Sequence, residues 1–334
     1  MRAARAVTLF GLLAFPAFAA AQTGLGGAIE VGAIGFYSHQ IAMAPSGDFV
    51  VAWTRLGGSL PAGAFGRIYK ATGAARTSEF RLNAKVQDFP DSVRLAMMND
   101  GSFVAVFFSH GFVLARRFSS RGQPLSGNLT LVRADLIWIN VGSRGDGSFV
   151  LSWYGSSGSL VRVFGADGKP LGPEASLDSY AVDTPRLAVG RDGSFLVVWQ
   201  AGLRDGNYGV QGQIFDRSGV ARGASFAISD PWPPANGGTE GYDATVGDDG
   251  NFIVTWGFPN GATGGREAFV RRFALDGSPL AEPSSLGASQ AGRVLAAGPG
   301  GSFVSVWPAD SPNSSRLDVV AGQFGADDEP LGSR

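Results

Sequence analysis

Residues 192–199 read Asp-Gly-Ser-Phe-Leu-Val-Val-Trp, and this phrase returns six times along the 334-residue chain. Each copy has a Gly, a Phe two positions later and an aromatic residue six positions after the Gly. The copies begin 54, 46, 46, 57 and 51 residues apart, at Gly47, Gly101, Gly147, Gly193, Gly250 and Gly301. A regular spacing of this length is typical of repeat architectures.

A second phrase follows in every copy, where an aromatic residue precedes a turn residue by four positions. The pairs are Tyr69 with Gly73, Phe118 with Gly122, Phe164 with Gly168, Phe215 with Gly219, Phe273 with Gly277 and, as the deviant, Phe324 with Asp328. Asp-Gly and related pairs at both turns predict tight hairpins, because such turns need residues that tolerate positive φ. Each copy therefore reads as a meander of four antiparallel strands, A to D, in which tight turns join A to B and C to D.

The strand B segments are apolar on both faces, which predicts sheets covered on both sides. Small residues five positions before the first turn Gly, such as Ala42 and Ala188, suit first strands crowded round a narrow axis. We therefore predict an all-β fold, a six-bladed β-propeller of four-stranded antiparallel blades. The N-terminal strand at residues 27–31 is expected to close the last blade. An open β-solenoid or a pair of sandwiches is the alternative.

Residues 1–21 resemble a secretory signal peptide, with Arg2 and Arg5 before an apolar run and small residues at the cleavage region. The predicted mature chain, 22–334, is then one propeller domain, exported by a Sec-type signal peptide to the periplasm or the exterior, and we expect a monomer. The chain has no Cys and a formal net charge of −1. No basic stripe indicates nucleic-acid binding, and no later apolar run predicts membrane insertion.

The phrase at 192–199, with Gly-Val-Gln-Gly-Gln-Ile-Phe-Asp at 209–216, resembles a repeat of large secreted bacterial proteins. Those repeats read approximately Asp-Gly-Gly-Phe-Val-Val-Ala-Trp, then Gly-Val-Tyr-Ala-Gln-Arg-Phe-Asp. The resemblance covers all six copies and implies a propeller-like β fold on a secreted or cell-surface protein. It implies no catalytic residues.

Length variation is concentrated in the B–C and D–A connections, where we expect any ligand site, because varied loops on a constant scaffold often carry function. The richest stretch lies in the fourth and fifth copies, where aromatic and polar residues suit a glycan or peptide. The candidate ligand-binding residues are Asp205, Asn207, Tyr208, Trp232, Glu240, Tyr242 and Arg266. For this stretch, however, the favoured interpretation is that Trp232 folds back to staple a long loop, with Asp205 and Asn207 as turn formers.

A catalytic site is the second hypothesis, because a carboxylate pair could perform acid–base chemistry on a glycoside. Its members would be Asp91, Arg94, Asp183, Arg186 and Asp243, all at or near the starts of strand A segments. Asp91 and Asp183 both lie near Pro, where loop turns explain them as well. The residues at the starts of the strand A segments include no evident acid–base pair.

No metal site and no cofactor are predicted. His39 and His110 have no His or Cys partner at metal-ligand spacing. Asp248-Asp249-Gly250 lacks the alternating oxygen ligands of an EF-hand-type calcium loop, so calcium stays an alternative that no motif supports.

The preferred hypothesis is a secreted, non-catalytic binding propeller whose variable loops recognise a glycan or a cell-surface protein. A glycosidase-like propeller hydrolase is the alternative, and a structural repeat domain without a small ligand is a third. The fold alone does not choose among them.

Overall fold

The computed structural model describes residues 31, 36–55, 61–85, 90, 92–133, 138–156, 158–177, 184–203, 205–232, 241–260, 265–288, 294–310 and 317–331. Their regular secondary structure is β-strand, apart from one 3-10 turn, η2 (Pro299–Gly301), and they contain no α-helix.

Six antiparallel sheets follow one another along the chain, and each pairs its strands in chain order. The first three contain β1 (Phe36–Met43), β2 (Phe49–Arg55), β3 (Gly63–Tyr69) and β4 (Phe80–Arg81); β5 (Ser92–Met97), β6 (Phe103–Ser109), β7 (Phe112–Phe118) and β8 (Leu129–Arg133); β9 (Trp138–Ser143), β10 (Phe149–Gly155), β11 (Gly158–Phe164) and β12 (Ala175–Ser176). The last three contain β13 (Arg186–Val189), β14 (Phe195–Gly202), β15 (Tyr208–Phe215) and β16 (Ala221–Ala227); β17 (Tyr242–Val246), β18 (Phe252–Asn260), β19 (Gly265–Phe273) and β20 (Ser284–Ala288); β21 (Val294–Ala297), β22 (Phe303–Asp310) and β23 (Leu317–Phe324).

The sheets are the blades of the predicted all-β, six-bladed β-propeller fold. Five blades have four strands, and the last has three among the described residues. The expected closure of that blade by residues 27–31 stays a prediction, because residues 27–30 lie outside the described part of the chain.

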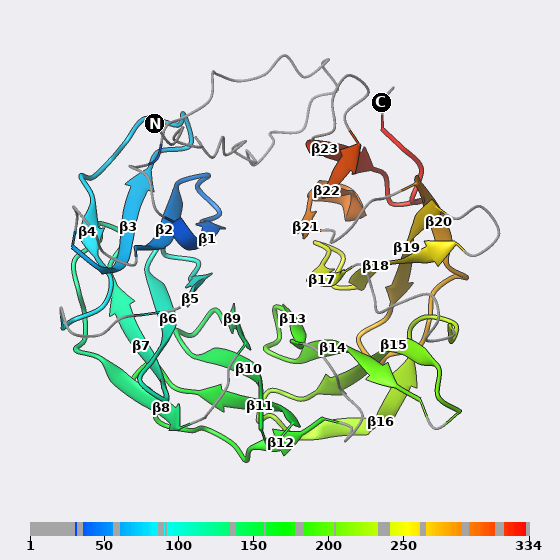
Figure 1. Ribbon diagram of the computed structural model, residues 1–334, viewed down its shortest axis with the longest axis horizontal. Helices are drawn as coiled ribbons and strands as arrows, with labels where there is room; N and C mark the ends of the chain where they lie inside the picture. The colour runs from blue at the N-terminus through cyan, green and yellow to red at the C-terminus, as the bar shows by residue number, and fades with distance from the viewer. Residues whose placement is uncertain are drawn as a thin grey trace, which may run out of the picture. The chain divides into compact units, whose positions relative to one another are not determined.

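The chain divides into two compact units, residues 1–149 with 164–170 and residues 150–163 with 171–334. In the first unit, the first strands β1, β5 and β9 lie next to one another in that order (Figure 1). In the second unit, β13, β17 and β21 do the same (Figure 1). Each unit thus brings together the starts of three first strands, where the sequence predicted a site.

The two repeated phrases meet inside each blade, because the Phe of strand B pairs with the aromatic residue of strand C. In the fourth blade Phe195 lies opposite Phe215, and their stacked rings have centroids 5.1 Å apart. Four other blades show the same stacked pair, with centroids 4.9–5.7 Å apart. Offset stacking adds about 0.5–1.5 kcal/mol to the free energy gained by burying the rings.

Each unit has its own hydrophobic cores, built where one blade's strand B faces the next blade. In the first unit Val50 and Ala52 pack with Val93 and Leu95. In the second unit, Leu196 and Val198 belong to the cluster that contains Val254. The alternate residues of the same strands, such as Phe195 and Val197, pack on the other side. The prediction that strand B is buried on both faces is confirmed.

Candidate functional site

The starts of the first strands in the first unit form a polar surface around Arg94. Nη1 of Arg94 donates to the carbonyl of Val93 at 3.0 Å and lies 3.5 Å from Oγ of Ser38 on the neighbouring strand β1. The same hydroxyl accepts the N–H of Val93 at 3.4 Å. Arg94 is thus half-buried, with its guanidinium held between β1 and β5, and the exposed His39 follows Ser38 on β1.

Trp138 adds an exposed aromatic ring to this surface. It begins β9, the strand beside β5, and is 63% exposed, which is unusual for so large an apolar side chain. Asn140 follows on the same face of β9, because side chains two positions apart in a strand share a face. Its Oδ1 accepts the N–H of Val141 at 2.8 Å. An exposed indole can stack on a ring, and guanidinium, amide and hydroxyl groups on the same and neighbouring strands can hydrogen-bond to its substituents.

The corresponding place in the second unit is more tightly closed. The guanidinium of Arg186 on β13 lies 5.9 Å from the ring centroid of Tyr242, which begins β17. Tyr242 is only 3% exposed, and its hydroxyl donates to the carbonyl of Thr184 at 2.8 Å. Tyr242 therefore joins two strands rather than presenting a ring to a ligand.

Asp243 connects the next two strands of the second unit. Its Oδ2 accepts the N–H of Leu295 on β21 at 2.9 Å, and Oδ1 accepts the N–H of Ala244 at 3.0 Å. Burial raises the pKa of the Asp243 carboxyl above its usual value, while the N–H of Leu295 and the charge of Arg186 oppose that shift. Arg186 and Asp243 are the two predicted catalytic residues that the structure brings into electrostatic contact.

The other predicted catalytic residues do not join that pair within one described unit. Arg94 belongs to the first unit. Asp91 and Asp183 lie outside the described residues.

The predicted ligand platform at Trp232 is wrong as an exposed surface. Trp232 is 3% exposed and packs in a cluster with Tyr208, Tyr242 and Trp256. Its backbone pairs with that of Tyr208 through two hydrogen bonds of 2.8 and 2.9 Å. Burying the indole removes more apolar area from water than exposure would, so the ring staples the connection after β16.

Asp205 and Asn207 act as turn formers. Oδ1 of Asp205 accepts the N–H of Asn207 at 3.0 Å, and Oδ2 accepts from Nδ2 of the same residue at 2.9 Å. Arg266 lies on β19, opposite Pro259, and its side chain is not described. Glu240 lies outside the described residues.

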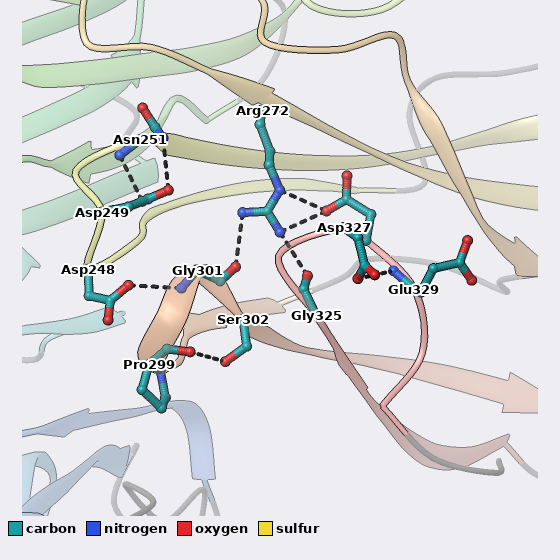
Figure 2. A network of polar contacts seen from close by, with 11 residues as sticks. Asp248, Asp249, Asn251, Arg272, Pro299, Gly301, Ser302, Gly325, Asp327 and Glu329 are labelled. Atoms are coloured by element: carbon teal, nitrogen blue, oxygen red, sulfur yellow. Dashed lines mark hydrogen bonds and ion pairs between the residues drawn. The ribbon is translucent and has the colours of Figure 1, made fainter. Parts of the chain in front are cut away.

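A third polar group lies at the turns of the last two blades, around Arg272 of β19 (Figure 2). Its guanidinium donates to the carbonyls of Gly301 at 2.9 Å and Gly325 at 3.0 Å, and it pairs with the Asp328 carboxylate at 2.8 Å. Asp248 accepts the N–H groups of Gly300 and Gly301 at 2.7 and 2.8 Å. These contacts tie two turns to the preceding blade, and both charges of the ion pair are nearly buried.

Neither a metal cluster nor a membrane-spanning helix is found where the structure describes the chain. Its described side chains contain no group of three or more His, Cys, Asp or Glu able to hold a metal ion. None of its described helical residues forms a helix long and apolar enough to cross a bilayer.

No protein-family profile and no curated protein matches the sequence. Among solved structures, the chain resembles an ulvan lyase of polysaccharide lyase family PL25 bound to a GlcA(1-4)Rha3S saccharide. The TM-score is 0.53 at 12% identity, over 89% of this chain and 85% of that one. It also resembles prolyl oligopeptidase B from Galerina marginata, with a TM-score of 0.52 at 10% identity. That match covers 86% of this chain but only 40% of the oligopeptidase.

These two structural similarities show the propeller fold of this chain and nothing about its activity. A lyase and a peptidase share the fold with this chain at almost equal similarity, so the fold does not select an activity.

Sequence reasoning missed Trp138 as a candidate. The residue stands nine positions before the turn glycine Gly147, where the D–A connection leads into strand A of the third copy. Its position at the start of β9 could have marked Trp138 as a candidate. The residues that begin the first strands of neighbouring blades lie next to one another, so an aromatic residue there is placed where a ligand site was expected.

Proposed function

We propose that the protein is an exported, non-catalytic β-propeller that binds a glycan where the first strands of its first three blades begin. The observation that carries the proposal is the exposed indole of Trp138 beside the strand that holds Arg94. Sugar rings present a C–H face that stacks on an indole, while their hydroxyl groups exchange hydrogen bonds with guanidinium and amide groups.

The described residues of the three first strands offer polar groups for binding and no pair of carboxyl groups. A glycoside hydrolase of the usual kind needs two carboxyl groups flanking the scissile bond. The described strands β1, β5 and β9 carry no Asp or Glu. They offer His, Arg, Gln, Asn and Ser side chains, which bind polar ligands without supplying a carboxyl pair.

The test begins by screening the exported protein against immobilised glycans, followed by calorimetry with the best ligand. Trp138→Ala should weaken binding by up to about tenfold, because a stacked aromatic ring contributes about 0.5–1.5 kcal/mol. Phe112→Ala is the matched control, since Phe112 is also an exposed aromatic residue of the first unit, 38% exposed on β7. A glycan that bound equally well to Trp138→Ala would place recognition elsewhere, and a screen without any binding glycan would refute the proposal.

The proposal includes export, which rests on the signal-like residues 1–21. Mass spectrometry of the protein recovered from outside the cytoplasm should find a mature N-terminus near Ala20 to Gln22. Protein that kept residues 1–21 and stayed in the cytoplasm would contradict this part of the proposal.

A second candidate function is glycosidase-like hydrolysis in the second unit. The burial that raises the pKa of the Asp243 carboxyl favours it, because a general acid of a glycosidase is typically a carboxyl whose pKa its environment raises. If a glycan is cleaved, Asp243→Asn should abolish cleavage while Trp138→Ala leaves the chemical step intact. Both oxygens of Asp243 already accept backbone N–H groups, so the binding proposal remains the better supported one.

A further inference from the structure

A cleft of about 240 Å³ lies between the turns of the first two blades, at the other end of the first strands from Trp138. Its apolar floor includes Ala44, Val50, Ile68 and Met97. Its polar lining consists of Ser46, Asp48, Arg76, Asn99, Asp100 and Ser120, together with the backbone of Gly101.

Between the last two blades, the space equivalent to this cleft is filled by the side chain of Arg272. Arg272 precedes the strand C aromatic residue Phe273, and its Nη1 lies 3.8 Å from where a Cβ on the turn glycine Gly301 would be. From there the guanidinium reaches two turn carbonyls and the Asp328 carboxylate of the following blade (Figure 2).

The second blade repeats this arrangement toward the third. Arg117 precedes the strand C aromatic residue Phe118, and its Nη2 lies 3.7 Å from the Cβ position of the turn glycine Gly147. Two separate blades of the protein therefore send an arginine side chain from the same strand position to the following blade's turn.

The first blade has Ile68 at this position, before Tyr69. The corresponding turn glycine is Gly101, and the atoms near its Cβ position belong to Ser120 and Ala44, with no guanidinium among them. Ile68 is shorter than arginine and has no charge, so it fills only the floor of the cleft. The cleft is the space that a guanidinium occupies elsewhere in the fold.

The charge and the size of the cleft also fit one arginine side chain. Asp48 pairs with Arg76, whereas Asp100 hydrogen-bonds within its own turn through Oδ1, which accepts the N–H and Oγ–H of Ser102 at 2.9 and 2.6 Å. The lining thus has two carboxylates and one guanidinium, which leaves one negative charge, and Arg117 acts on Asp100 from outside the lining. Pockets for drug-sized ligands measure roughly 300–1,000 Å³, so this one suits a side chain better than an oligosaccharide.

We propose that this cleft binds the side chain of an arginine presented by a partner polypeptide. The methylene groups of the side chain would lie along Ile68 and Met97, and the guanidinium would donate to Asp100, to Asn99 or Ser120 and to the turn backbone at Gly101. A planar guanidinium with five donors suits several acceptors spread over two turns better than an ammonium does. This protein-binding site is separate from the proposed glycan surface.

The probe is N-acetyl-arginine methylamide, titrated into the exported protein by calorimetry or NMR, with the citrulline analogue as the uncharged control. The arginine probe should bind at least about tenfold more tightly, because hydrogen bonds to a charged group are the stronger ones. Asp100→Asn should weaken binding of the arginine probe by about tenfold, since Asn keeps the turn bond and removes the charge. Asp276→Asn is the matched control: Asp276 makes the same bonds to Ser278 in a turn that does not line the cleft.

Ile68→Arg gives an independent test, because the new side chain should occupy the cleft as Arg272 occupies its own. Folded Ile68→Arg protein should lose arginine binding by at least about tenfold, whereas Ile214→Arg, the equivalent change in the fourth blade, should retain it. If Ile68→Arg does not fold, Asp100→Asn decides. Equal affinity for the arginine and citrulline probes, or undiminished binding to Asp100→Asn or to folded Ile68→Arg, would overturn the proposal.

Discussion

Asp328 occupies the turn position that glycine occupies in the other five C–D turns, and it has the same left-handed backbone, with φ of 65°. Aspartate is among the few residues that tolerate this conformation. The structure gives a reason for the exception, because the carboxylate pairs with Arg272 from the preceding blade. Sequence reasoning identified Asp328 as the deviant residue, but it could not find the partner, which lies 56 positions away.

Arg272→Met should lower the free energy of unfolding by about 3–5 kcal/mol, because it leaves a nearly buried carboxylate without its partner. Asp328→Gly in the same background should recover part of that loss, since it removes the stranded charge and restores the common turn residue. Urea unfolding of both single variants and the double variant measures the coupling. Additive effects would show that the pair is not coupled.

Acid should destabilise the protein through its turn aspartates. Hydrogen bonds from Ser102 lower the pKa of Asp100, and those from Ser194 lower the pKa of Asp192. A carboxyl with a lowered native pKa stabilises the fold above its unfolded pKa of about 3.9, and that contribution is lost as the pH falls through the native value. Urea unfolding between pH 5 and 2.5 should therefore show falling stability.

Asp192→Asn isolates one of these contributions, because Asn keeps the turn but does not titrate. Its stability should fall less steeply below pH 4 than that of the unaltered protein. Asp243 and Asp328 act in the opposite sense: burial raises their pKa values, so their contribution is full at low pH and is lost as the pH rises. Unchanged steepness in Asp192→Asn would contradict the assignment.

Among the elements, the connection after β16 shows a choice that sequence reasoning could favour but not decide. Trp232 sits among Pro residues, and the sequence was compatible both with a rigid exposed platform and with an inward staple. The choice depends on whether a neighbouring blade leaves room for the ring, which no local pattern encodes. In the structure Trp232 packs in the core cluster that contains Tyr242 and against which Tyr208 packs.

Trp232→Ala should accordingly act on stability, with a loss of about 3–5 kcal/mol from deleting a buried aromatic side chain. Thermal unfolding followed by near-ultraviolet circular dichroism measures it. Leu171→Ala, at a residue that is 56% exposed, should change the melting temperature little. A Trp232→Ala protein as stable as the original would show that the ring is dispensable for packing.

For the whole molecule, the repeated phrases predicted the number of blades, their strand order and their two-sided cores. They did so because each turn and each stacked pair is local and recurs six times. The candidate site was not predictable in the same way. Trp138 belongs to no repeated phrase, and its importance comes from the exposure of its ring and the nearness of β5, which arise only after folding.

Hydrogen exchange should show the same order of amide protection in both units, with strand B amides more protected than strand D amides. Strand B segments such as β6 and β14 are almost fully buried and paired on both sides, whereas β16 is largely exposed and β4 and β12 have two residues each. We expect strand B amides to exchange at least about tenfold more slowly than strand D amides within each of the five four-stranded blades. Equal protection across the blades would contradict this order of local stability.

The bond between Arg272 and Asp328 also bears on how a chain of duplicated segments can be rearranged. Most copies here share interchangeable turn residues, so recombination could replace one with another and keep the turn chemistry. The fifth copy can be exchanged singly only for one with an arginine at this position, as the second copy has in Arg117, and the sixth copy is the one whose turn carries the aspartate. A swapped fifth copy without the arginine would leave Asp328 with a buried charge, and a swapped sixth copy without the aspartate would leave Arg272 with one. These two segments are therefore expected to be inherited, and to be engineered, as a single module.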